Sequence, residues 1–121
     1  MLGARFAVHP DPRRGTELQP DVLVARDADF TDKDLPTAPL LAVEVLSPST
    51  RLIDQNLKRA AYERMGTPSF WLLDPTVPDL TVLELDKGRY RQVAYVIGDE
   101  PFEASQPFPV RVVPAELLAR R

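Results

Sequence analysis

The feature that most constrains the fold is the almost uninterrupted apolar run Leu-Leu-Ala-Val-Glu-Val-Leu at residues 40–46. A run that is apolar on both faces is typical of a central strand covered on each side. Its one charged residue, Glu44, must be paired, protonated or bound to a metal ion if the strand is buried. The simpler alternative places Glu44 at the end of the strand, facing water or paired with an arginine.

Shorter signals predict the elements around this strand. A helix is expected over residues 53–65, because Gly66 and Pro68 supply stop signals and four apolar residues recur at helical spacing: Leu57, Ala60, Ala61 and Met65. Alternation and turn residues predict strands at 5–8, 21–25 and 69–73, and a hairpin of 80–85 with 89–97 around Asp86-Lys87-Gly88. An edge strand is expected over 108–113 and a short helix over 114–120.

This order of elements, strand, strand, helix, strand, hairpin and helix, favours an α/β (α+β) fold built on a mixed sheet. The chain has 121 residues, which is enough for one domain and too few for two. We therefore expect residues 1–121 to form a single domain.

Composition restricts the chemistry that such a domain could perform. Cysteine is absent and His9 is the only histidine, so a disulfide scaffold, a thiolate metal site and a multi-histidine site are all excluded within one chain. A bound metal would need oxygen ligands, as magnesium, manganese and calcium prefer. The net charge of −3 argues against nucleic-acid binding by the whole surface. No apolar stretch approaches the roughly 20 residues of a membrane span, so a soluble cytoplasmic protein is expected.

A second carboxylate could join Glu44. Asp21 opens the predicted strand at 21–25, and if that strand neighbours residues 40–46, both carboxylates can meet at one end of the sheet. Two carboxylates about 4 Å apart repel each other strongly where the dielectric constant is low. A divalent cation between them would turn this repulsion into affinity.

The motifs follow one another in a family-specific order. The chain resembles the Uma2 (DUF820) family over about residues 20–86, through a series of motifs in the order that this family has. The motifs are Pro20-Asp21, the segment Glu-Val-Leu-Ser-Pro-Ser-Thr at 44–50, the helical residues Asp54, Lys58 and Tyr62, the stop signals Gly66 and Pro68, and Trp-Leu-Leu-Asp-Pro at 71–75. This family belongs to the PD-(D/E)XK nuclease superfamily. The resemblance implies a restriction-endonuclease-like mixed sheet core flanked by helices.

The resemblance also implies a site and an activity, the hydrolysis of DNA by a metal-dependent endonuclease. Asp21, Glu44 and the backbone carbonyl of Val45 would hold Mg²⁺ or Mn²⁺. The position two residues after Glu44, where the superfamily motif has lysine, is Leu46. The resemblance implies that Lys58 on the following helix takes that role, and that Tyr62 contacts a phosphate.

Each of these residues also has a structural interpretation. Lys58 could pair only with Asp54 one turn earlier, and Tyr62 could be a core aromatic residue with its hydroxyl at the surface. Three arginines could contact the nucleic-acid backbone or could simply form the solvated face of the helix: Arg51, Arg59 and Arg64.

The chain is short before the Pro20-Asp21 motif. The N-terminal helix of the family is expected to be missing, which would expose apolar surface on the sheet and favour a homodimer. The alternative to an active enzyme is a catalytically inactive, truncated nuclease fold that serves as an interaction module.

Overall fold

The computed structural model describes residues 2–3, 22–24, 38–46 and 52–119. Its elements, in chain order, are β1 (Leu2–Gly3), β2 (Val22–Val24), β3 (Leu41–Val45), α1 (Leu52–Met65), β4 (Ser69–Asp74), β5 (Asp79–Asp86), β6 (Arg89–Ile97), β7 (Phe102–Ala104), β8 (Val110–Val112) and α2 (Pro114–Ala119). Strands β1 to β6 form one six-stranded sheet in sequence order, and β7 and β8 form a separate two-stranded sheet. The described residues therefore confirm an α+β arrangement with a mixed sheet.

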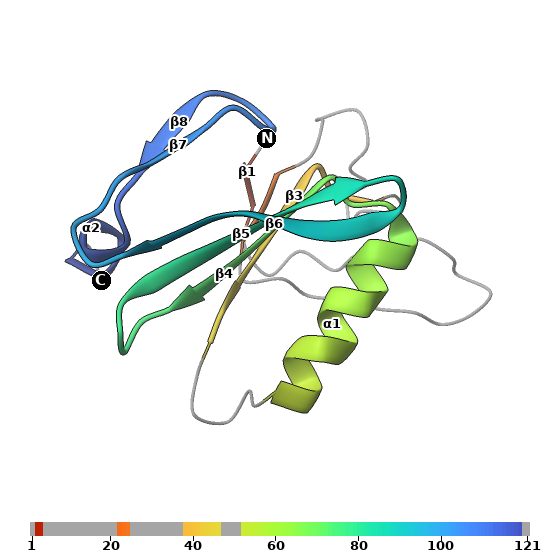
Figure 1. Ribbon diagram of the computed structural model, residues 1–121, viewed down its shortest axis with the longest axis horizontal. Helices are drawn as coiled ribbons and strands as arrows, with labels where there is room; N and C mark the ends of the chain where they lie inside the picture. Colours follow the sequence, from red (N-terminus) through yellow and green to blue (C-terminus); the bar gives the residue numbers. More distant parts are fainter. Residues whose placement is uncertain (1, 4–21, 25–37, 47–51, 120–121) are drawn as a thin grey trace.

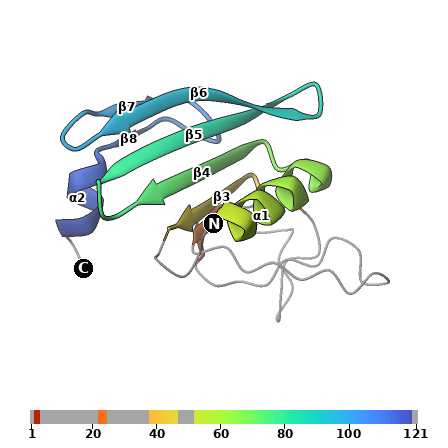
Figure 2. The same cartoon turned by 60° about the horizontal axis from the view of Figure 1, so that its bottom comes forward.

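The centre of the sheet is the parallel pair β3 and β4, and all other neighbouring strands are antiparallel. Parallel strands need a crossover connection, and α1 supplies it. Figure 2 shows α1 lying along β3 and β4, while β5 and β6 continue the sheet away from the helix. Figure 1 shows the β7–β8 hairpin and α2 at the other side of the molecule from α1.

Two groups of buried side chains cover the two faces of the sheet. The helix-side cluster lies under α1 and consists of Ala42, Tyr62, Phe70, Leu83 and Tyr90. The hairpin-side cluster lies under β7 and β8 and consists of Val24, Leu41, Trp71, Leu73, Leu80, Val82, Ala104 and Val112. Alternate residues of β3 and β4 enter the two clusters, as the two-residue period of a strand requires. The expected burial of both faces of β3 is confirmed.

Helix α1 presents only part of the expected stripe to the sheet, since Met65 packs against the helix-side cluster and Leu57 does not. Tyr62 lies near the C-terminal end of the helix, where it is fully buried against Phe70, with ring centroids 5.3 Å apart. Leu57, which was expected in the buried stripe, is 65% exposed. The reason is geometric, because five residues correspond to roughly 140° of rotation around a helix. Once Tyr62 faces the sheet, Leu57 must face away from it.

The ends of α1 and of the β5–β6 hairpin follow the expected signals. Gly66 has φ of 86°, and the amides of Gly66 and Thr67 both donate to the carbonyl of Tyr62, at 3.1 Å each. This is a left-handed helix end of the kind that favours glycine. At the hairpin, Lys87 and Gly88 have φ of 53° and 82°, as a two-residue turn with positive φ at both positions requires.

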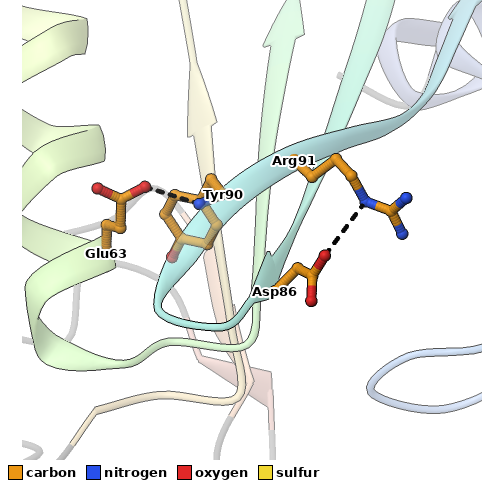
Figure 3. A network of polar contacts seen from close by, with 4 residues as sticks. All are labelled: Glu63, Asp86, Tyr90 and Arg91. Atoms are coloured by element: carbon orange, nitrogen blue, oxygen red, sulfur yellow. Dashed lines mark hydrogen bonds and ion pairs between the residues drawn. The ribbon is translucent and has the colours of Figure 1, made fainter.

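Helix α1 is fastened to the hairpin through Tyr90. Glu63 accepts a hydrogen bond of 2.7 Å from the backbone amide of Tyr90, and the Tyr90 hydroxyl donates to the carbonyl of Thr67 at 2.8 Å. Figure 3 shows Glu63 reaching from the helix to the strand, and Arg91 directed at Asp86 on the outer side of the hairpin, 3.9 Å away. Burial raises the pKa of the Tyr90 phenol, and the negative charge of Glu63 raises it further by a smaller amount.

The expected C-terminal strand is present but in another place. It forms as β8, yet it pairs with β7 instead of adding to the edge of the main sheet. Strand β7 was not predicted, because three residues give too short a pattern to identify. The pair packs on the hairpin-side cluster, where Trp71 meets Phe102 edge-on with ring centroids 5.8 Å apart. The strand expected at 5–8 lies outside the described residues.

Candidate active site

Glu44 occupies a buried position in the middle of the sheet. It lies on the same face of β3 as Ala42, beneath α1, and is opposite Leu72 on the parallel strand β4. Glu44 is only 5% exposed. The alternative in which Glu44 faces water at the end of a strand is therefore wrong. A carboxylate removed from water in this way needs a compensating charge or donor.

Lys58 supplies a compensating charge. Its ammonium nitrogen lies 3.4 Å from Oε1 of Glu44, and its side chain is about one-third exposed (32%). The ion pair that the described residues show for Glu44 is with a lysine on the following helix. The alternative in which Lys58 pairs only with Asp54 on its own helix is therefore wrong, because Lys58 pairs with Glu44. The side chain of Asp54, the other expected partner, lies outside the described residues.

A small pocket opens beside this ion pair. Its volume is about 10 Å³, and its walls come from Glu44, Val45, Leu46, Gln55, Lys58, Phe70 and Leu72. A volume of this size is about what one water molecule requires. The pocket therefore brings a carboxylate, an ammonium group and an amide together at a site that is largely shielded from solvent.

Gln55 is the residue of this pocket that the motifs did not indicate. It precedes Lys58 by three residues and Tyr62 by seven, so all three project from the same side of the helix. Once Tyr62 is known to face the sheet, this spacing predicts that Gln55 lies in the pocket. The signal was present in the sequence, but it depended on knowing which face of α1 is buried.

The donor groups suit a hard divalent cation in part. Glu44 offers carboxylate oxygens, and the backbone of Val45 and the side chain of Gln55 carry carbonyl oxygens, which magnesium and manganese accept. In the described ranges, however, no group of three or more His, Cys, Asp or Glu side chains could hold a metal. Asp21 lies outside the described residues. For Asp21 to meet Glu44, the strands β2 and β3 would have to be neighbours, and they are, with Val22 opposite Val43.

Tyr62 lies in the core and not at the surface of the site. It is fully buried in the helix-side cluster, so its hydroxyl does not reach the solvent from which a phosphate would approach. The phosphate contact expected for Tyr62 has no support in this geometry. The hydroxyl at the surface, expected in the alternative, is also wrong. Arg59 and Arg64 are exposed on α1, and Arg51 lies outside the described residues.

Comparison with known proteins now decides the family. The sequence profile of Uma2, described as "Putative restriction endonuclease", matches residues 2–117. The chain belongs to the Uma2 family. This match spans nearly the whole chain and includes both Glu44 and Lys58. The comparison with curated proteins gives no match.

A solved structure supports the same fold. The chain is similar to the crystal structure of "a putative nuclease belonging to DUF820" from Anabaena variabilis, with a TM-score of 0.62 and 18% identity. The similarity covers 98% of this chain and 67% of that protein. The Uma2 chain thus has the restriction-endonuclease-like mixed fold. Within the described ranges, neither helix is long and apolar enough to cross a bilayer.

Proposed function

We propose that this Uma2 protein is a divalent-metal-dependent endonuclease that hydrolyses phosphodiester bonds in DNA, with Mg²⁺ or Mn²⁺ as the cofactor. The observation that carries the proposal is the buried Glu44 carboxylate held 3.4 Å from the ammonium group of Lys58. A purely structural core gains little from this arrangement, because an apolar residue of similar volume is often as stable or more stable. Retaining a carboxylate there suggests a chemical role.

The metal would be held at the Glu44 end of the pocket. Glu44 and the backbone carbonyl of Val45 would provide oxygen ligands, and Asp21 would provide the second carboxylate. When bound, a divalent ion at such a site lowers the pKa of a coordinated water and polarises the scissile phosphate. The apolar walls formed by Leu46, Phe70 and Leu72 keep the local dielectric constant low, so these charges act strongly.

Lys58 would act on the substrate and not on the metal. Its side chain is about one-third exposed, so the ammonium group can contact both Glu44 and a group arriving from solvent. During hydrolysis, negative charge develops on the phosphoryl oxygens, and an ammonium group within hydrogen-bonding distance stabilises that charge. Gln55 would orient the attacking water by hydrogen bonding from the same side of α1.

The test is cleavage of supercoiled plasmid DNA with Mg²⁺, with Mn²⁺ and with a chelator, comparing wild type with Glu44→Gln and Lys58→Gln. Glu103 and Arg111 provide a matched control, since they form an exposed ion pair of 3.7 Å on the β7–β8 hairpin. We expect both site variants to lose cleavage by a factor of about 100 or more, as for other groups that stabilise developing charge. Glu103→Gln and Arg111→Gln should keep wild-type activity.

A second readout separates metal binding from catalysis. Titration calorimetry with Mn²⁺ should show binding to wild type and to Lys58→Gln, and much weaker binding to Glu44→Gln. Cleavage that survives in both site variants would place the activity elsewhere. Absence of both metal binding and cleavage in the wild type would instead favour the alternative function, a catalytically inactive nuclease fold that acts as an interaction module.

A further inference from the structure

The outer strand of the sheet, β6, carries an unusual concentration of exposed apolar side chains. Three large ones lie on this single strand, with exposed fractions of 39% for Val93, 49% for Tyr95 and 43% for Ile97. Strand β6 is the last strand in the order of the described sheet. Edge strands of soluble proteins are normally protected by charges or irregularities. Here the charged residues lie at the start of β6 and just after its end, and the segment from Val93 to Ile97 between them is apolar, which indicates an interaction surface.

Tyr95 and Ile97 share one face by the two-residue alternation of a strand, and a bulge at Val93 determines which face that is. Val82 is opposite Ala94 and Leu83 is opposite Gln92, so Val93 is the extra residue of β6. Ala94 and Val96 point into the hairpin-side cluster, which directs Tyr95 and Ile97 to the side of the sheet that α1 occupies. Helix α1 lies along β3 and β4 and does not extend over this part of β6 (Figure 2).

Backbone geometry limits how much of the edge can pair. The Gly98 amide donates to the carbonyl of Pro78, at the β5 side, so by alternation the amides of Ile97 and Tyr95 point outward. Glu100 closes the edge at Ile97, accepting from its amide through Oε1 (3.0 Å) and donating its own amide to the Ile97 carbonyl (3.1 Å). Of these two residues, Tyr95 is therefore the one whose outward backbone groups remain open to a partner strand.

Charge decides which partner suits this edge. The strand begins with the exposed residues Arg89 and Arg91 and is followed by the exposed residues Asp99 and Glu100. An antiparallel copy of the same strand brings the basic start of one copy alongside the acidic end of the other. A parallel copy would bring like charges together.

We propose that two copies of this chain associate through antiparallel pairing of their β6 strands, with the two-fold axis at Tyr95. In this register the backbones of the two Tyr95 residues pair, and Ile97 adds side-chain contact only, because Glu100 occupies its backbone groups. The side chain of Val93 lies beside Ile97 of the partner subunit, and Arg91 lies near Asp99 of the partner subunit. The contact is self-complementary, as a two-fold interface must be. Because only a short segment pairs, the buried area falls below the roughly 1,200 Å² of standard interfaces, and the dimer is weak and depends on concentration.

The experiment is sedimentation velocity of the full chain from about 10 micromolar to about 1 millimolar, a range that brackets weak association. Wild type should shift from monomer to dimer over this range. Ile97→Lys should weaken association at least tenfold. Phe108→Lys is the matched control, because Phe108 is 46% exposed but lies outside β6, and it should behave like wild type. Both variants should keep the wild-type melting temperature.

A charge exchange tests the register itself. Arg91→Glu and Asp99→Arg should each weaken association, and the double variant should restore it, because the opposite charges again meet across the axis. A chain that stays monomeric, a dimer that tolerates Ile97→Lys, or equal weakening by Phe108→Lys would overturn the proposal. Growth beyond the dimer, or failure of the double variant to recover, would overturn the two-fold register.

Discussion

The ammonium nitrogen of Lys58 lies 3.4 Å from Oε1 of Glu44, although the two residues belong to different elements, α1 and β3. Their environments are unequal, since the Glu44 side chain is 7% exposed and the Lys58 side chain is 32% exposed. Lys58 can therefore return to water if its partner is lost, whereas Glu44 cannot. This asymmetry gives the site a distinct stability signature.

The first prediction concerns that asymmetry. Lys58→Met should lower the free energy of unfolding by about 3 kcal/mol, because it removes a positive charge that lies 3.4 Å from a buried carboxylate. Glu44→Gln should change it by less than about 1 kcal/mol, because the remaining ammonium group can move into solvent. Urea denaturation of both variants measures the difference. Equal losses in the two variants would contradict the inferred environments, and Arg111→Met serves as an exposed control.

The second prediction separates the core role of Tyr62 from a catalytic one. Tyr62→Ala should cost about 3–5 kcal/mol, because it empties the centre of the helix-side cluster. Tyr62→Phe keeps the ring against Phe70 and should leave DNA cleavage near the wild-type rate, because the hydroxyl does not reach solvent. Cleavage and thermal unfolding should be measured together. A tenfold loss of cleavage at unchanged stability would assign the Tyr62 hydroxyl to phosphate after all.

The third prediction concerns alkaline pH. The pKa of Tyr90 is raised above its ordinary value of 10.0 by burial and by the charge of Glu63. The folded state therefore keeps this proton when the unfolded state has released it, so stability is full below about pH 10 and falls as the pH rises further. Tyr90→Phe should make this fall shallower. Tyr90→Phe should also lower the free energy of unfolding by about 1 kcal/mol at neutral pH, because it removes the hydrogen bond to the carbonyl of Thr67.

These two effects of Tyr90→Phe are measured by urea denaturation at neutral pH and at several values above pH 10. The neutral loss reports the hydrogen bond, and the change in alkaline slope reports the raised pKa. An alkaline slope identical to that of wild type would show that other groups dominate the titration.

The fourth prediction concerns the end of α1. Gly66 has φ of 86°, and a Cβ at this position would meet nothing within 4 Å, so only the backbone conformation opposes a side chain. Gly66→Ala should cost about 1–2 kcal/mol, and Gly66→Asn should cost less, because asparagine tolerates this conformation better. Thermal melting of the two variants orders them. A loss in Gly66→Asn as large as that in Gly66→Ala would contradict the assignment.

Much of the local structure could be predicted because it depends on short-range chemistry. The apolar run at 40–46 identified the central strand, Gly66 and Pro68 marked the end of the helix, and Lys87-Gly88 supplied the turn of the hairpin. Each signal acts within a few residues, through side-chain alternation, positive φ or a missing amide donor. The same pattern identified Glu44 as the residue whose burial would need compensation.

Tertiary structure alone decided which face of α1 packs against the sheet. That choice buries Tyr62, exposes Leu57, brings Gln55 into the pocket and places Lys58 beside Glu44. It also decided that β8 pairs with β7 over Trp71, and not with the edge of the main sheet. Helical periodicity fixes which residues share a face, but the packing of distant elements determines which face turns inward.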